Sequence, residues 1–377
     1  MHDTHKRSLD ALARRQRLRF LAPRRGLDFS SNDYLGLAEA AELRAAAEEA
    51  LARGVPLGAG GSRLLRGNHP EHEALEADAA RHFGAEAALF FGGGFVANTA
   101  IFSTLPERGD LIVHDALIHA SVHEGFAGSR AEHVAFAHND ASAAEDAIRA
   151  WRAEGGTGRP WIAVESIYSM DGDAAPLDAL AEVARRHDAM LVIDEAHATG
   201  VLGPQGRGLG AQLEGREDII ALHTCGKALG VSGAIVTLPA ILRDYMVNRA
   251  RAFIYATAPS PLIASVVREA LKLTATSEDL RARHAALVAH AGKLLAEACG
   301  VPSSGSHIQP VIVRHDQRAL SLATRMQDAG FDIRAVRPPT VPEGTARLRI
   351  SFTLNVTDDD VKRMADTLAD ALREVSA

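Results

Sequence analysis

The sequence is poor in cysteine and has no long apolar run. Two cysteines, Cys225 and Cys299, occur in 377 residues, which excludes a disulfide framework or a zinc site built from cysteine alone. No stretch of about 18 apolar residues is present, so we expect no membrane-spanning helix. The first twenty residues are highly charged and lack the apolar core of a signal peptide. We therefore expect a protein of the cytoplasm, a reducing compartment.

An excess of positive charge is also lacking. The chain has 41 Lys and Arg against 48 Asp and Glu, a net charge of −7. Proteins that neutralise a phosphate backbone usually carry the opposite balance, so nucleic acid is not an expected partner. The hydrophobic fraction of 47% and the charged fraction of 24% are typical of a folded globular chain.

What is present is an alternation of short apolar runs with helical stretches. Several runs are almost continuously apolar, as expected for strands buried on both faces. Their alternation with helices predicts a mostly parallel α/β sheet. The predicted strands are Ala87–Phe91, Leu111–Val113, His133–Phe136, Trp161–Val164, Met190–Ile193, Ile219–Leu222 and Gly233–Thr237. Helices are predicted at 7–20, 38–53, 70–82, 261–273 and 278–299, and mixed strands and helices follow in the tail.

Polar residues follow four of these strands. Glu165 follows Trp161–Val164, and Asp194 and His197 follow Met190–Ile193. Thr224 and Lys227 follow Ile219–Leu222, and His119 lies shortly after Leu111–Val113. In open α/β sheets, ligands bind outside the carboxyl ends of the strands. We therefore expect these side chains to gather at one edge of the sheet and to form the functional site.

Lys227 has two interpretations. It lies in Thr224-Cys-Gly-Lys-Ala-Leu-Gly230, after a buried strand, and a lysine in such a loop is usually a solvated surface residue. A Schiff-base lysine for pyridoxal phosphate (PLP) is the alternative. PLP also needs a carboxylate at its pyridinium nitrogen, which Asp194 would supply, and a helix start for its phosphate, which Gly92–Asn98 would supply.

Other motifs are less complete. Asp194-Glu-Ala-His197 spells a helicase box, but no phosphate loop of the form GxxxxGK[ST] accompanies it. His119 and His123 have the spacing of zinc ligands without the glutamate of HExxH. Gly206–Gly210 lacks the spacing of a dinucleotide loop, and the Asp171-Gly-Asp173 turn is explained without an ion. We expect no metal.

The ordered motifs resemble those of the α-oxoamine synthases, a family of PLP-dependent enzymes. The resemblance covers nearly the whole chain from about residue 27. It is carried by Asn32–Gly36, Gly58–Arg63, His69–Glu76, Gly94–Asn98, Ser169–Asp173, Asp194–Gly200, Thr224–Lys227 and Arg347–Arg349.

The resemblance implies the fold type I (aspartate aminotransferase-like) architecture, with a mostly parallel seven-stranded sheet and a smaller C-terminal α+β domain. We expect an N-terminal arm at 1–37, a large PLP-binding domain at 38–265 and a small domain at 266–377. It also implies a homodimer with its active site at the subunit interface.

Within the family, Arg337–Pro342 favours the branch that joins L-alanine to a pimeloyl thioester. The implied products are 8-amino-7-oxononanoate, CO2 and the free thiol carrier, in biotin biosynthesis. The carrier, coenzyme A or acyl carrier protein, stays open. The alternative is a sibling that uses glycine or serine, of the 5-aminolevulinate synthase, 2-amino-3-oxobutyrate ligase or serine palmitoyltransferase type.

The resemblance also implies roles for individual residues. Lys227, His119, Asp194 and His197 would be catalytic, and these four also contact the cofactor. The further cofactor-binding residues would be Gly94, Phe95, Glu165, Ser169, Thr224 and, from the partner subunit, Thr257. Asn32, Arg349 and Thr340 would bind substrate, with Arg349 holding the carboxylate of the amino acid.

Overall fold

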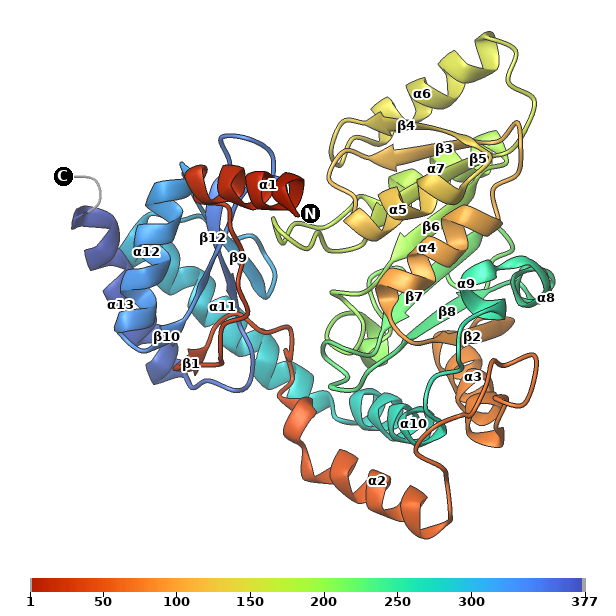
Figure 1. The fold of residues 1–377 in the computed structure, drawn as a ribbon, viewed down its shortest axis with the longest axis horizontal. Helices are drawn as coiled ribbons and strands as arrows, with labels where there is room; N and C mark the ends of the chain where they lie inside the picture. The colour runs from red at the N-terminus through yellow and green to blue at the C-terminus, as the bar shows by residue number, and fades with distance from the viewer. Residues whose placement is uncertain (1, 375–377) are drawn as a thin grey trace. The chain divides into compact units, whose positions relative to one another are not determined.

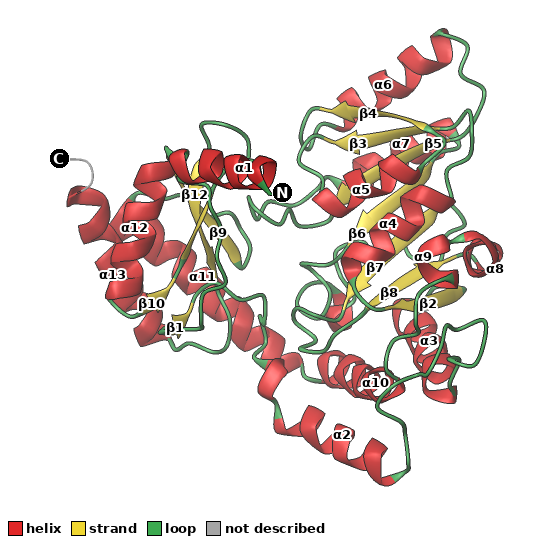
Figure 2. Ribbon diagram, in the orientation of Figure 1, coloured by secondary structure: helices red, strands yellow, loops and turns green. Residues whose placement is uncertain are grey.

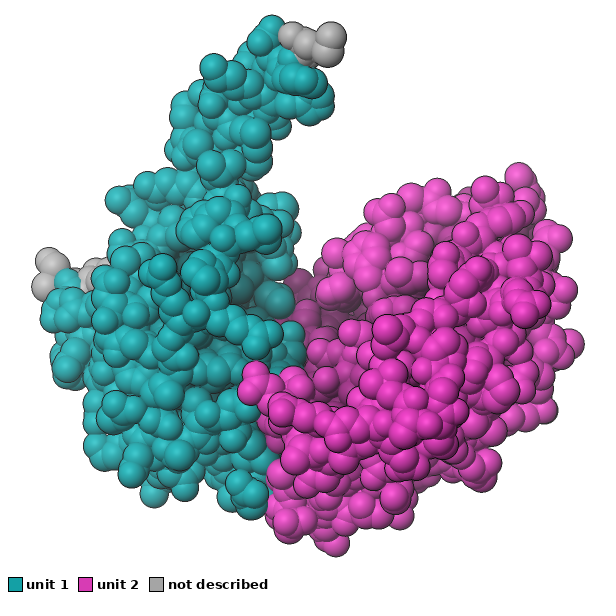
Figure 3. Space-filling model, turned by 60° about the horizontal axis from the view of Figure 1, so that its bottom comes forward, with its two compact units in different colours: residues 1–34, 170–173, 283–377 teal, residues 35–169, 174–282 magenta. Residues whose placement is uncertain are grey.

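The computed structural model describes residues 2–374 and divides the chain into two compact units (Figures 1 and 3). Unit 2 comprises residues 35–169 and 174–282, and unit 1 comprises residues 1–34, 170–173 and 283–377. Among the described residues, no helix is both long and apolar enough to cross a lipid bilayer.

Unit 2 contains the seven-stranded sheet, in the order β2-β8-β7-β6-β5-β3-β4 (Figure 2). Strand β8 is antiparallel to both β2 and β7, and the other neighbouring pairs are parallel, which confirms the mostly parallel sheet. The strands are β2 (Ala87–Phe91), β3 (Leu111–Asp115), β4 (Glu132–Phe136), β5 (Pro160–Glu165), β6 (Met190–Asp194), β7 (Ile219–Thr224) and β8 (Ala234–Leu238). Each overlaps a predicted strand.

Helices cover both faces of this sheet. The side chain of Val192 packs into a cluster with residues of α4, α5 and α9. Its neighbours Leu191 and Ile193 point the other way, into a cluster with α6 and α7, as the alternation of side chains along a strand requires. In the view of Figure 1, α4 and α5 pass in front of the sheet. The helices of unit 2 are η1 (Leu37–Glu39), α2 (Ala41–Ala52), α3 (Pro70–Phe83), α4 (Gly94–Thr104), α5 (Ala120–Gly128), α6 (Ala141–Ala153), α7 (Leu177–His187), η2 (Pro204–Gly206), α8 (Ala240–Arg249), α9 (Arg251–Ile254) and α10 (Pro261–Thr276).

Unit 1 has its own core, built around a three-stranded antiparallel sheet in the order β11-β12-β9. A two-stranded parallel sheet joins β1 to β10. The strands are β1 (Leu27–Asp28), β9 (Ile308–Arg314), β10 (Phe331–Asp332), β11 (Arg334–Val336) and β12 (Ala346–Ser351). The helices are α1 (Asp3–Arg14), α11 (Glu278–Cys299), which contains the boundary at 282/283, α12 (Asp316–Asp328) and α13 (Asp358–Glu374).

This division differs from the three parts expected from the sequence. Residues 1–34 belong to unit 1 because β1 pairs with β10 and the amide of Ser351 donates to the carbonyl of Phe29. Residues 266–282 stay with unit 2 because α10 packs against α2 and α3. The boundary therefore lies at 282/283 rather than at 265/266.

Candidate active site

The predicted rim residues of unit 2 lie where the sheet topology places them. Glu165 and Asp194 end neighbouring strands β5 and β6 and are paired in register. Thr224 ends β7, the next strand in the sheet. His119 precedes α5, after β3, and caps that helix through its side chain. Gly94 and Phe95 are the first two residues of α4, after β2.

Lys227 lies on the nine-residue connection between β7 and β8. The amide of Cys225 donates to the carbonyl of Gly233, and the amide of Gly230 donates to the carbonyl of Lys227. Gly230 has φ +68°, and a Cβ on it would lie 2.6 Å from the amide nitrogen of Ala38. Only glycine tolerates both conditions at little cost. The loop conformation that presents Lys227 is thus fixed by backbone contacts.

The Lys227 amine contacts a histidine. Its Nζ lies 2.7 Å from Nε2 of His197. His197 is buried, and it follows β6 by three residues. This pair brings together residues from two separate strand ends, as the sequence predicts.

Two residues that the predictions do not include hold this rim together. Nδ2 of Asn98, inside α4, donates to Oδ2 of Asp194 at 2.7 Å and to Oγ of Ser121 at 3.0 Å. The amide of Ala196 donates to the other oxygen of Asp194. Ser121 Oγ lies 2.8 Å from Nδ1 of His119. A polar chain therefore joins Asp194 to His119.

This chain fixes the tautomer of His119. The amide N–H of Ser121 donates to Nδ1 of His119, so Nδ1 is an acceptor and the ring proton resides on Nε2. Burial lowers the pKa of His119. The negative charge of Asp194 opposes this shift, and the positive charge of Lys227 adds to it. The imidazole is therefore neutral at neutral pH, with Nε2 as its donor.

Glu165 is a buried acid with an unusual environment. Its Oε2 accepts from the amide of Ser169, and its Oε1 is buried without a hydrogen-bond partner among the described residues. Burial, followed by repulsion from Asp194, raises the pKa of Glu165 to about 8. Glu165 is thus a neutral acid at pH 7.

The residues present fit PLP. Asp194 is a carboxylate oriented by two donors, as the pyridinium nitrogen requires. A Cβ on Gly92 or Gly93 would meet nothing within 4 Å, so the backbone before α4 is open to a close ligand. The first amides of α4 have no acceptor within their helix and suit a phosphate. A Cβ atom built on Gly94 would lie 3.6 Å from Oγ1 of Thr224, so the Thr224 hydroxyl lies beside the start of α4.

The three expected substrate residues belong to unit 1. Arg349, on β12, is buried and donates to Ser351 Oγ at 2.7 Å and to Asn32 Oδ1 at 3.0 Å. Asn32 Oδ1 also accepts from the hydroxyl of Tyr34. Thr340 is exposed and accepts a hydrogen bond from Arg19.

The two arginines of Arg347-Leu-Arg349 differ in their partners. The Arg347 side chain is 3% exposed and forms an ion pair with Asp171. Arg349 donates hydrogen bonds to a hydroxyl and to an amide oxygen. Because its ion pair commits Arg347 to Asp171, Arg349 is the better candidate to bind a substrate carboxylate.

The last two candidates, Thr257 and His123, have other surroundings. Thr257 is exposed in unit 2, and its neighbour Ala258 donates to the carbonyl of Gly61. His123, the second member of the i,i+4 pair with His119, lies against the ring of His114. Across residues 2–374, no three His, Cys, Asp or Glu side chains are grouped so as to hold a metal ion.

Comparisons with known proteins show the family of this chain. The family of class I and II aminotransferases matches residues 24–368. A curated relative from Geobacter sulfurreducens, named 8-amino-7-oxononanoate synthase, is 41% identical over 369 residues, which cover 96% of this chain and 93% of the relative.

Two solved structures share the fold. A structure of SPT (serine palmitoyltransferase) with its PLP internal aldimine has a TM-score of 0.86 and 28% identity. The match covers 92% of this chain and 87% of that one. The 8-amino-7-oxononanoate synthase of Francisella tularensis has a TM-score of 0.79 and 28% identity, over 93% of this chain and 99% of that one. The chain therefore belongs to the class I and II aminotransferase family and, within it, to the PLP-dependent α-oxoamine synthases of fold type I.

Proposed function

We propose that the protein is an 8-amino-7-oxononanoate synthase, which condenses L-alanine with a pimeloyl thioester and releases CO2 and the thiol carrier. The observation that carries this proposal is the amine of Lys227 beside Nε2 of His197, on the rim that holds the oriented carboxylate of Asp194. Relatives about 41% identical over most of the chain support the choice of reaction.

The cofactor would be held by residues from several strand ends. Asp194 would bind the ring nitrogen, His119 would lie against the ring, and His197 would bind the ring hydroxyl. The other cofactor contacts would come from Gly94, Phe95, Glu165, Ser169, Thr224 and Thr257. When bound, PLP supplies an electron sink for the electron pair left at the alanine Cα.

Lys227 moves the proton at the alanine Cα. A lysine does so as a general base when its amine is neutral, and its Nζ then holds the proton until it is returned to the product carbon. His197 Nε2 fixes the direction of this amine at 2.7 Å. Positioning of this kind removes orientational freedom from the proton transfer.

His119 acts on oxygen rather than carbon. Because its Nδ1 accepts from Ser121, its Nε2–H is the donor, and we assign this proton to the carbonyl oxygen of the acyl donor. A hydrogen bond there stabilises the negative charge that develops as the thioester is attacked. The lowered pKa of His119 keeps the ring neutral at neutral pH, so Nδ1 can accept from Ser121 while the single ring proton stays on Nε2.

Arg349 binds the carboxylate of alanine, with Asn32 and Thr340 as further substrate contacts. A planar guanidinium forms two parallel bonds to a carboxylate. Holding that group fixes which bonds at Cα can react. The carboxylate carbon later leaves as CO2, and the thiolate of the carrier takes up a proton.

We also propose a cytoplasmic homodimer. Three large apolar side chains of unit 2 are exposed, which supports contact with a second copy: Phe95 is 52%, Leu65 85% and Tyr255 73% exposed. Thr257 is exposed two residues after Tyr255 and would reach the phosphate bound by the partner. The two free cysteines support a reducing compartment.

The test is an absorption titration of the purified holoprotein with L-alanine, glycine and L-serine, followed by turnover with pimeloyl-coenzyme A. We expect the visible band of the cofactor to respond at the lowest concentration of L-alanine, and product to form only with this amino acid. Preference for glycine or serine would move the protein to a sibling activity. A protein that shows no visible band after PLP is added would overturn the proposal.

A further inference from the structure

The loop Gly206-Arg-Gly-Leu-Gly210 has no part in the proposed reaction, although its glycines resemble those of a dinucleotide-binding loop. In the structure it encloses a carboxylate of the chain itself. The amides of Leu209 and Gly210, successive along the loop, both donate to the side chain of Glu195. Successive backbone amides that converge in this way form a nest, which binds anions. The anion that this loop holds is therefore Glu195.

The loop fits closely around this side chain. A Cβ atom built on Gly208 would lie 2.6 Å from Cδ of Glu195, and one built on Gly210 would lie 2.8 Å from Oε1. Gly208 also has φ +102°. Glycine is thus required at residue 208 both for its backbone conformation and for its contact with the carboxyl group. We call residues 206–210 the glycine cradle.

Both carboxylate oxygens of Glu195 accept from backbone amides. Oε1 accepts from the amide of Gly210. Oε2 accepts from the amide of Leu209 at 3.2 Å and from the hydroxyl of Ser166 at 2.5 Å. Glu195 is 0% exposed, so these protein groups replace the water that a carboxylate would otherwise bind. The side chain is therefore anchored through three donors on two separate segments of unit 2.

The charge of Glu195 agrees with this geometry. Burial raises the pKa of Glu195 to about 6, and the nearby carboxylate of Glu214 adds to this shift. The hydrogen bond from Ser166, the imidazole of His223 and the amide of Gly210 oppose it. The side chain is therefore ionised at neutral pH, as an acceptor of three hydrogen bonds should be.

The backbone of Glu195 connects this buried anchor to the rim. Its carbonyl accepts from the amides of Ala198 and Thr199 and from the hydroxyl of Thr199. These hydrogen bonds close a turn over residues 195–199, and His197 lies inside that turn. Nε2 of His197 is the atom that lies 2.7 Å from Nζ of Lys227. The position of His197 beside the lysine thus depends on a turn that is closed on Glu195.

We infer that Glu195, held in the glycine cradle, is a positioning residue that fixes the turn 195–199 and, through it, the contact between His197 and Lys227. This inference rests on the proposed function for the importance of Lys227, but the contact itself involves only side chains of this chain. Glu195 acts through His197 and takes up no proton in the reaction. The glycine cradle is therefore part of the support of the active site.

The experiment measures the reactivity of the Lys227 amine in the full-length, cofactor-free protein. Lysines are labelled with limiting acetic anhydride over a series of pH values, and mass spectrometry gives the pH midpoint of labelling at each lysine. Lys272, Lys293 and Lys362 have exposed side chains and serve as internal references. A change that is confined to Lys227 reports on its contact with His197, which a general loss of stability would not produce.

Two variants disturb the anchor, and a third is the control. In Glu195→Gln the new NH2 group must face a backbone N–H, because each oxygen of Glu195 accepts from one. Ser166→Ala removes a single donor, so it supplies the answer if Glu195→Gln does not fold. Glu145→Gln is the control, since Glu145 is a carboxylate of unit 2 that accepts from Arg186 and His187, away from the turn.

We expect Glu195→Gln to move the labelling midpoint of Lys227 by about 0.5 unit or more, and Ser166→Ala to move it less in the same direction. The reference lysines should keep their wild-type midpoints. Glu195→Gln should also weaken PLP binding about fivefold or more in a fluorescence titration. Glu145→Gln should lower the melting temperature but leave the midpoint of Lys227 and the PLP affinity near wild type.

Two results would overturn the positioning role. One is a Lys227 midpoint that stays at the wild-type value in the folded variants of Glu195 and Ser166. The other is an equal shift in Glu145→Gln, which would show a general loosening of unit 2. A shift confined to Lys227 in Glu195→Gln, with no turnover of L-alanine and a pimeloyl thioester by wild type, would support the positioning role and refute the proposed reaction. The two proposals therefore fail separately.

Discussion

The side-chain amide of Asn98 lies 2.7 Å from Oδ2 of Asp194 and 3.0 Å from Oγ of Ser121. One nitrogen thus orients both the carboxylate proposed for the ring nitrogen and, through Ser121, the imidazole of His119. Asn98 is 1% exposed, so it can act only as a positioning residue behind the cofactor.

Asn98→Ala should weaken cofactor binding. The variant removes a hydrogen bond to a charged acceptor, worth about 1.5–3 kcal/mol, or roughly 10–150-fold in the dissociation constant of PLP. A fluorescence titration of cofactor-free protein measures it. Asn248→Ala, which removes an exposed amide that donates to Asp244, is the control. Equal PLP affinities for Asn98→Ala and wild type would contradict the role assigned to Asn98.

Lys227→Ala should abolish turnover without unfolding the protein. Loss of a general base costs roughly 10²–10⁴-fold, and loss of the cofactor-linking amine adds to this. Lys227 is only half-buried, so the melting temperature should change little. Lys272→Ala, at a 71% exposed side chain, should behave as wild type. Wild-type turnover by Lys227→Ala would sink the mechanism.

Arg349→Lys should raise the KM for L-alanine about tenfold or more, because an ammonium cannot form the two parallel bonds of a guanidinium. Steady-state kinetics with a fixed pimeloyl donor measures it. Arg347→Lys provides the contrast, since Arg347 is bound to Asp171. That variant should lower the melting temperature instead. The reverse pattern would assign the carboxylate to Arg347.

Glu165→Gln should change how stability depends on pH. Because the pKa of Glu165 is raised from 4.5 to about 8, the folded wild type holds a proton that the unfolded chain releases above pH 4.5. Wild-type stability should therefore fall between about pH 4.5 and 8. The variant cannot ionise and should lack this fall. Chemical unfolding of the cofactor-free proteins at about pH 5 and pH 8.5 measures the difference. Parallel stability curves would show that Glu165 is already ionised at pH 7.

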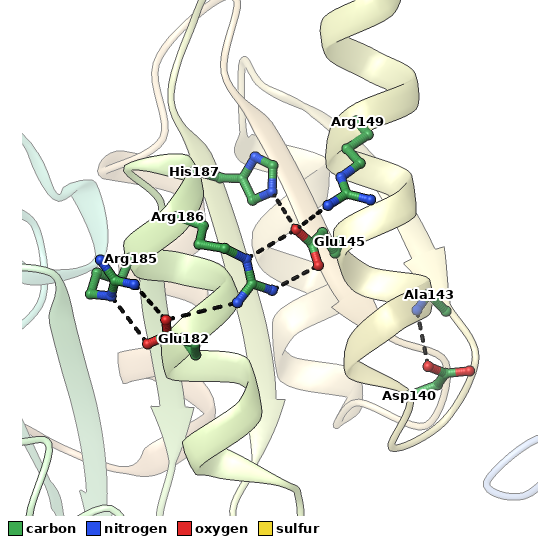
Figure 4. Close-up of polar contacts among 8 residues, drawn as sticks. All are labelled: Asp140, Ala143, Glu145, Arg149, Glu182, Arg185, Arg186 and His187. Atoms are coloured by element: carbon green, nitrogen blue, oxygen red, sulfur yellow. Dashed lines mark hydrogen bonds and ion pairs between the residues drawn. The ribbon is translucent and has the colours of Figure 1, made fainter.

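Glu145→Gln should destabilise the protein at neutral pH. Glu145, on α6, accepts hydrogen bonds from Arg186 and His187 of α7 and from Arg149 (Figure 4). These hydrogen bonds, that of Arg186 first, lower the pKa of Glu145 to about 2. The stabilisation is present above about pH 4.5 and is lost as the pH falls toward 2.

Thermal unfolding across that range measures this effect. The difference in melting temperature between wild type and Glu145→Gln should be largest near neutral pH and should shrink as the solution is acidified. Glu182→Gln is the control, because its side chain is 50% exposed and pairs with Arg185 on the same helix. A larger effect from Glu182 would show that the contacts of Glu145 between the helices contribute little.

The sheet and its rim were predictable from local sequence. The strands from Ala87 to Thr237 are short apolar runs, and the residue after each run must lie at the edge of the sheet. Asn98 and Ser121 were missed because each lies within a helix, where nothing in the spacing shows that it turns toward Asp194. Asn98 does end the glycine-rich motif, which is the one signal that could have identified it.

The ends of elements and units were harder to predict. The predicted helix at 7–20 lies at Asp3–Arg14, because the backbone of Gln16 has φ +57° and ends it. The boundary at 282/283 falls inside a continuous helix, and an apolar helical face does not tell which core it covers. The roles of the site residues, from Lys227 and Asp194 to Arg349, Thr340 and Thr257, stay predictions.

Strand β8 runs antiparallel to both of its neighbours, β2 and β7. Two reversals cancel, so β2 and β7 point the same way and bring the start of α4 and Lys227 to one edge of the sheet. The arrangement requires an even number of strand reversals between β2 and β7. One more antiparallel strand inserted between them would place the start of α4 and Lys227 at opposite edges of the sheet. Lys227 also stands on a hairpin rather than on a crossover to a helix, so two hydrogen-bonded strands resist its displacement.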